Sequence, residues 1–229
     1  MSNFDSDGGS DNQWEDRGDL AWNEFDWERY LRDQDQAIHR YVKFYEACEG
    51  PDRIDRVAEQ MHWGDEDWTD EREGAEAVLD EDADKAPSED EDDVYTLHKN
   101  PIFIATKSIY LSLYRSWEMI AADATKVPQP LALALQSSLH RGEEQAVQAI
   151  HALDFGDYAM AISLFKRALS ALNGSLALLN DNAALRHRAV KQWREPALSR
   201  FFDLREVWLR VIAECRDELE RPDEDDDEE

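Results

Sequence analysis

Residues 101–122, PIFIATKSIYLSLYRSWEMIAA, decide the fold class because they are the most apolar stretch of the chain. Asn100 precedes Pro101, and proline at the first helical position is a helix-start signal. Apolar side chains occupy most of the circumference, which is typical of a helix at the centre of a bundle or in half of a dimer interface. One narrow polar stripe remains, formed by Lys107, Ser108, Ser112, Arg115 and Glu118.

The same stretch argues against a membrane protein. Lys107, Arg115 and Glu118 lie within it, and charges inside a membrane span are costly. The first twelve residues, MSNFDSDGGSDN, lack the basic and apolar regions of a signal peptide. We therefore expect a cytoplasmic protein that does not bind membranes.

Helical periodicity continues toward the C-terminus. We expect a second helix from Pro130 toward Phe155 and a third from Tyr158, with Gly174 either ending the third helix or lying inside a longer one. Pro196 should mark the last boundary, because proline removes an intrahelical hydrogen bond. The clearest pattern of all then follows, at steps of three and four residues: Leu204, Val207, Trp208, Val211, Ile212, Cys215 and Leu219.

Two shorter patterns precede the apolar stretch. One helix should begin near an Asp19 cap and reach Cys48, ended by Gly50 and Pro51, and a short one should cover 52–62. No segment alternates as a strand does. The sequence therefore predicts an all-α fold, an antiparallel up-and-down helical bundle of about four to five long helices with flexible acidic segments. Cys48 and Cys215 lie on apolar faces, so we expect buried, reduced thiols.

Charge divides the chain into unequal parts. The 53 acidic and 25 basic residues give a net charge of −28. Residues 1–93 hold 32 of the acids and nine of the bases, whereas 94–221 are nearly balanced and 222–229 add seven acids. We expect five regions: a disordered acidic N-terminus (1–18), N-terminal helices packing on the bundle (19–62), a flexible acidic insert (63–93), the main bundle (94–221) and a disordered acidic tail (222–229). A chain this acidic is a poor direct binder of nucleic acid phosphates.

One polar helix face has the residue types of a metal site. His140, Glu144 and His151 share it, but eleven residues separate the two histidines by roughly 16 Å along a helix, too far for one ion. A site would need partners from other helices, such as Glu118 or His187. The alternative is an ordinary solvated face. No nucleophile motif or phosphate-binding loop is present. We therefore expect no cofactor, and we favour a protein without catalytic activity over an enzyme.

A hairpin pattern covers residues 142–173. Gly156-Asp157-Tyr158, Ala161-Ile162, Phe165 and Ala168-Leu169 resemble the second half of a tetratricopeptide repeat, with Ala149 at the small position of the first helix. The resemblance implies a peptide-binding or scaffold role. Gln145 and Asn173 depart from that family's pattern and no second copy follows, so a generic hairpin of two close helices is the alternative.

Tryptophan is concentrated in the acidic part of the chain. Five of the eight tryptophans precede residue 69. Trp22 and Trp27 fit core contacts of the first helix, whereas Trp14, Trp63 and Trp68 are candidates for binding a partner, since tryptophan is enriched at binding hot spots.

The expected function is a non-enzymatic helical protein in protein–protein interaction, acting as a scaffold or regulator, with a basic protein partner and as a homodimer. Two alternatives stay open. One is a metal-binding helical-bundle protein or enzyme. The other is an acidic mimic that occupies the nucleic-acid site of a basic partner.

Overall fold

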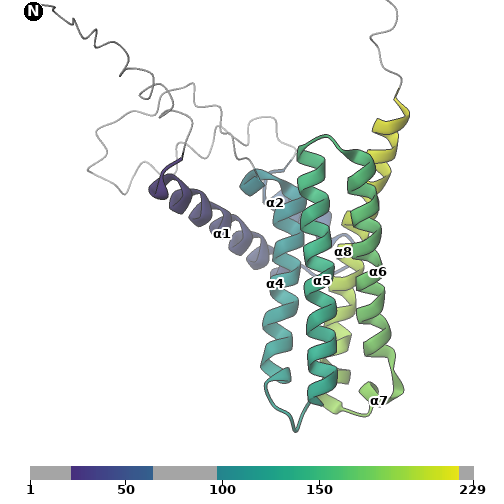
Figure 1. The fold of residues 1–229 in the computed structure, drawn as a ribbon. Helices are drawn as coiled ribbons and strands as arrows, with labels where there is room; N and C mark the ends of the chain where they lie inside the picture. The colour runs from purple at the N-terminus through teal and green to yellow at the C-terminus, as the bar shows by residue number, and fades with distance from the viewer. Residues whose placement is uncertain (1–21, 64–96, 222–229) are drawn as a thin grey trace, which may run out of the picture.

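The computed structural model describes residues 22–63 and 97–221, and within them it confirms an all-α fold (Figure 1). The regions expected at 1–18 and 222–229, and all of the acidic insert beyond Trp63, lie outside the described residues. The helices are α1 (Glu24–Ala47), α2 (Arg53–Gln60), the 3₁₀ helix η2 (Leu97–Lys99), α4 (Pro101–Ala121), α5 (Gln129–Asp154), α6 (Tyr158–Asn180), α7 (Asn182–Leu185) and α8 (Arg188–Glu220).

Four long helices, α4, α5, α6 and α8, form the antiparallel bundle (Figure 1). Each packs against the next along the chain, and α8 returns beside both α6 and α4, which closes the ring. Helices α1 and α2 lie outside this ring, where α1 crosses α4 obliquely and α2 contacts α8. No described helix has the length and apolarity needed to cross a bilayer.

Helix α4 begins at the predicted place and lies at the centre of the molecule. The Asn100 side chain accepts hydrogen bonds from the backbone nitrogens of Ile102 and Phe103 at 3.0 and 3.1 Å. α1, α5 and α8 all pack against α4. Its apolar circumference is therefore covered within one chain, so burying it does not require a second copy.

The polar stripe expected on α4 is partly an interior surface, because α1 covers it. Ser108 and Ser112 are buried, and the Ser108 hydroxyl donates to the Ile38 carbonyl at 3.1 Å. The Ser112 hydroxyl donates to Glu46 at 3.0 Å. Because both serine hydroxyls form hydrogen bonds with α1, α1 packs on this polar stripe without leaving these buried polar groups unsatisfied.

Helices α5 and α6 form the close hairpin that their small residues predict. Ala149, Ala161 and Ala168 are fully buried between the helices and the core. Gly142 lies where an added Cβ would overlap the Tyr110 hydroxyl. The turn between the helices uses Gly156 at φ +72°, a conformation that side chains disfavour.

The boundaries near the C-terminus differ from the prediction at one proline. α6 passes through Gly174 and ends at Asn180, after which Asp181 caps α7 by accepting from the Ala183 nitrogen at 2.9 Å. Pro196, expected to be a boundary, lies inside α8. That prediction is wrong. Gln192, whose carbonyl has no N–H partner at Pro196, and Pro196 itself both lie on the exposed face of α8, where solvent can satisfy that carbonyl and the helix continues.

Aromatic residues fill the bundle core. Trp117 and Trp208 are completely buried, and Trp117 packs 4.8 Å from Trp193 between ring centroids. The indoles of Trp208 and Trp193 donate to hydroxyls of α4, Thr106 at 3.2 Å and Ser116 at 2.9 Å. Both cysteines are buried and unpaired, as expected.

Candidate partner-binding site

The N-terminal half of α1 is the candidate site, and its local sequence explains why it is helical. Asn23 caps the helix by accepting from the nitrogens of Phe25 (2.8 Å) and Asp26 (3.3 Å). Asp26 returns the interaction by accepting from the Asn23 nitrogen at 2.9 Å, a complete capping box. Glu24 and Asp26 in the first turn also suit the helix dipole. The helix therefore begins at Glu24, and the cap expected at Asp19 lies outside the described residues.

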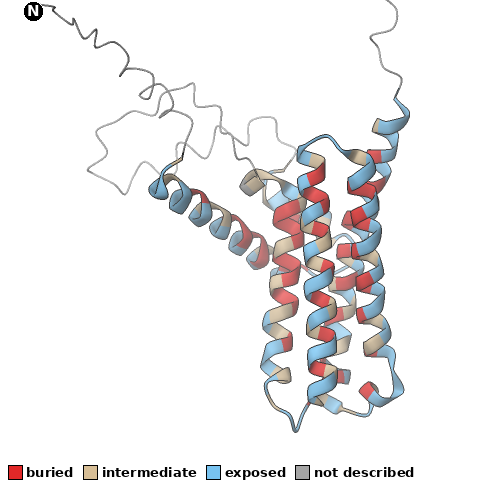
Figure 2. Cartoon of the chain, viewed as in Figure 1, coloured by how far each residue is buried: buried red, intermediate tan, exposed pale blue. Residues whose placement is uncertain are grey.

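One apolar seam runs the length of α1 and changes environment halfway. Its positions follow alternating steps of four and three residues, the spacing of a helix–helix contact line: Trp27, Leu31, Gln34, Ile38, Tyr41, Tyr45 and Cys48. From Ile38 onward the apolar members are buried against the bundle. Leu31 is 49% exposed and Trp27 is 38% exposed. Figure 2 shows mostly exposed positions in the N-terminal half of α1 and more buried positions toward the bundle. Tyr30 is the buried residue of the N-terminal half.

The exposed half carries further aromatic surface and excess acid. Phe25 is 74% exposed. Trp22 packs edge-on against Trp27 and Tyr30, with ring centroids 5.0 and 5.5 Å apart. Residues 24–36 hold five acids and two arginines. We call this half of α1, residues 24–36, the arm.

The C-terminal half of α1 is held firmly, which fixes the base of the arm. Besides the two α4 serines, Arg115 of α4 donates to His39 Nε2 at 3.0 Å. His39 Nδ1 lies 2.7 Å from the Asp35 carbonyl, so a neutral ring protonated at Nδ1 satisfies both contacts. Tyr41 stacks between Tyr45 and Trp63, with ring centroids 5.9 and 5.4 Å away.

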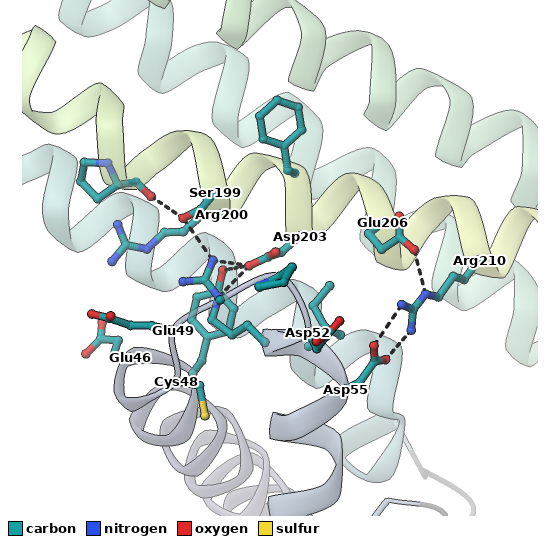
Figure 3. A pocket seen from close by; sticks show the side chains of 17 residues that line it. Glu46, Cys48, Glu49, Asp52, Asp55, Ser199, Arg200, Asp203, Glu206 and Arg210 are labelled. Atoms are coloured by element: carbon teal, nitrogen blue, oxygen red, sulfur yellow. Dashed lines mark hydrogen bonds and ion pairs between the residues drawn. The ribbon is translucent and has the colours of Figure 1, made fainter.

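A polar pocket of about 930 Å³ lies where the α1–α2 turn meets α8 (Figure 3). At its centre Asp203 of α8 accepts from Arg53 Nε at 2.9 Å, from Arg53 Nη2, and from the Tyr45 hydroxyl at 2.5 Å. Arg53 Nη2 also donates to the Ser199 hydroxyl at 3.2 Å, and its guanidinium lies 4.1 Å over the Tyr45 ring. Burial and the Asp203 carboxylate raise the pKa of Tyr45, which therefore remains a donor.

A second ion pair closes the outer edge of this pocket. Arg210 of α8 donates to both oxygens of Asp55, at 2.5 and 3.2 Å, and to Glu206 at 3.0 Å (Figure 3). The Arg210 hydrogen bond lowers the pKa of Asp55. Because the central carboxylate and both of these arginines are engaged in contacts between helices, we interpret the pocket as the latch that docks α1 and α2 on α8. We call Arg53, Asp203, Tyr45, Asp55 and Arg210 the latch.

Two buried polar atoms near the latch have no hydrogen-bond partner within the described part of the chain. They are the Tyr41 hydroxyl and Arg200 Nε, both buried. Burial raises the pKa of Tyr41, the nearby Asp203 carboxylate raises it further, and Arg53 acts against this rise. Cys48 lines the pocket, but it is buried. Its Sγ lies 3.9 Å from Gln60 Oε1, to which the thiol is a weak donor.

The five residues predicted as metal ligands are not brought together. Among residues 22–63 and 97–221, no group of three or more histidine, cysteine, aspartate or glutamate side chains could hold an ion. His140 stacks on Tyr114 at 4.9 Å and contacts its hydroxyl at 3.3 Å. The others lie on separate exposed or half-buried positions of α4, α5 and the start of α8: Glu118, Glu144, His151 and His187.

A carboxylate that the sequence did not single out organises this face instead. Glu143 accepts from the Tyr114 hydroxyl at 2.8 Å and pairs with Lys107 at 2.5 Å. Burial and the Glu143 charge raise the pKa of Tyr114. The contact ties α4 to α5, so we assign Glu143 a structural role.

The predicted partner-binding tryptophans have different outcomes. Trp63 is half-buried and stacks on Tyr41 against the core, which favours a packing role. Trp14 and Trp68 lie outside the described residues. The exposed seam residue Leu31 was visible in the sequence only as part of a helical face, and nothing local distinguishes it from Ile38.

Comparison with known proteins adds no identity. No protein family matches the chain, and no match was found among curated proteins or solved structures.

Proposed function

We propose that this protein is a non-enzymatic interaction protein that uses the arm of α1 to bind a basic partner protein. The observation that supports this most directly is the seam of α1, which is buried from Ile38 onward and continues to Leu31, which is exposed. A helix that presents apolar anchors at steps of three and four residues suits a partner with an apolar groove.

The charge of the arm supports a basic partner. The arm carries a net charge of −3, and the residues that precede it, 1–23, hold six acids and one arginine. Complementary potential steers association and selects partners of opposite charge. A groove that is apolar along its floor and lined by lysine and arginine at its rim fits both features of the arm.

The test is site-specific photo-crosslinking in lysate of the native cell. A photoreactive phenylalanine at Leu31 should crosslink to a basic protein. Affinity capture of that protein by the full chain without the probe should be lost when Phe25→Asp and Leu31→Asp are combined. The matched control is Leu133 on α5, which is 67% exposed and lies outside the arm. Raising the salt concentration should weaken capture, since exposed charges are screened.

Two results would contradict the proposal. One is an identical set of crosslinked proteins from Leu31 and Leu133. The other is a captured partner that survives the paired Asp substitutions while circular dichroism shows both proteins folded.

A further inference from the structure

A cationic surface lies at the end of the bundle where α6 passes into α8. Residues 182–194, NAALRHRAVKQWR, include four arginines and lysines and no acid. Arg186, Arg188 and Lys191 are exposed, and within the described residues none of the three forms an ion pair. Arg194 instead donates to Asn180 Oδ1 at 2.6 and 3.0 Å. We call Arg186, Arg188 and Lys191 the basic end.

The position of these cations is unfavourable for the helix that carries them. α8 begins at Arg188, its cap His187 makes no side-chain capping bond, and its first turn contains no acid. A helix N-terminus carries a partial positive charge of roughly half a unit, so cations there repel it. Acidic side chains brought to this end from outside would offset both the unpaired cations and the helix dipole.

The chain itself carries such a sequence at the far end of α8. Residues 223–229, DEDDDEE, are seven consecutive acids that follow the last helix. Figure 1 places α7 and the end of α8 at opposite ends of the bundle. A helix of 33 residues is about 50 Å long, whereas eight residues span at most about 28 Å. The acids of one molecule therefore cannot reach their own basic end.

We propose that the basic end binds residues 223–229 of a second copy, so that molecules associate head to tail. Both copies carry a charge of −28, which opposes association. At physiological salt, however, the Debye length is about 8 Å, so acids tens of ångströms from the contact contribute little. Because the two surfaces differ, the contact is heterologous and leaves a free end on each pair.

The first measurement uses a fluorescein-labelled peptide of residues 222–229 and the full chain, followed by anisotropy. The expected result is binding that weakens with salt and is lost for a peptide with Asn and Gln in place of the acids. The triple variant Arg186→Glu, Arg188→Glu and Lys191→Glu should bind at least about tenfold more weakly. Lys166→Glu with Arg167→Glu, exposed on α6, is the matched control and should bind as the native chain does.

The second measurement is sedimentation of the unlabelled chain over a wide concentration range at physiological salt, where the repulsion between distant charges is screened. Its mass should rise with concentration, and the rise should disappear in the triple variant and after deletion of 222–229. The triple variant should also melt no lower than the native chain, since glutamate at the start of α8 suits the helix dipole. A constant monomer mass, or peptide binding that is equal in the triple and control variants, overturns the proposal.

Discussion

Two glycines of the bundle differ in whether the surrounding atoms leave room for a Cβ. A Cβ at Gly142 of α5 would overlap the Tyr110 hydroxyl, so this glycine permits the close contact of α4, α5 and α6. A Cβ at Gly174 of α6 would meet only the Ser138 hydroxyl, at an ordinary 3.5 Å. Both residues look alike in the sequence, since each is a glycine within an amphipathic helical pattern.

We therefore expect opposite effects from the same substitution. Gly142→Ala should lower the free energy of unfolding by about 1–3 kcal/mol through overpacking, whereas Gly174→Ala should raise it by about 0.5–1 kcal/mol through lower backbone entropy. Chemical denaturation followed by circular dichroism measures both. Tyr110→Phe should recover much of the Gly142→Ala loss, and a cycle without such coupling would exclude the Tyr110 hydroxyl as the cause.

At the scale of elements, the latch holds α1 and α2 on the bundle through contacts of unequal burial. The Arg53 and Asp203 side chains are each 13% exposed, whereas Arg210 and Asp55 are each 49% exposed. Exposed ion pairs contribute little because water and salt screen them. The strength of the latch should therefore come from Asp203.

Asp203→Asn should lower the free energy of unfolding by about 1.5–3 kcal/mol, because it removes the charge that Arg53 and Tyr45 face. Asp55→Asn, the matched control, should cost about 0–1 kcal/mol. Hydrogen exchange should accelerate in α1 and α2 of the Asp203 variant and stay unchanged in the α5–α6 hairpin. Equal costs for the two variants would mean that the latch does not depend on burial.

At the scale of the whole molecule, four tyrosines on α1 and α4 connect stability to alkaline pH. Burial raises the pKa of Tyr41, Tyr45, Tyr110 and Tyr114, with further upward shifts from Asp203 for the first two and from Glu143 for the others. The folded protein therefore favours neutral tyrosine. This contribution to stability is fully present below the ordinary pKa of about 10 and is lost as the pH rises toward the higher folded values.

We expect the free energy of unfolding to fall steeply above about pH 10, with tyrosinate absorbance from these residues appearing together with loss of helix. Circular dichroism and absorbance recorded on one titration test this. Ionisation of all the tyrosines at their ordinary pKa, in a fully helical protein, would contradict it.

The basic end and the C-terminus of α8 lie at opposite ends of the bundle, and this arrangement comes from topology. The basic end lies where α6 passes into α8, and the acids of 223–229 follow the opposite end of α8. The net charges of the regions were readable from composition. The placement of the basic end and the C-terminus of α8 at opposite ends of the bundle depends on an antiparallel path that runs α8 past the whole length of the bundle.

The sequence by itself determined the class of the fold, the start of α4 at Pro101 and the inward face of α8 from Leu204 to Cys215, because these follow from side-chain periodicity and local capping. The last predicted position of that face, Leu219, is exposed. It also predicted the close α5–α6 hairpin from small residues. Only the tertiary structure decided that Pro196 lies within a helix, that Ser108 and Ser112 are buried beneath α1, and that Arg53 meets Asp203. These outcomes depend on which face a second helix covers, and contacts between residues 150 positions apart leave no periodic signal in the chain.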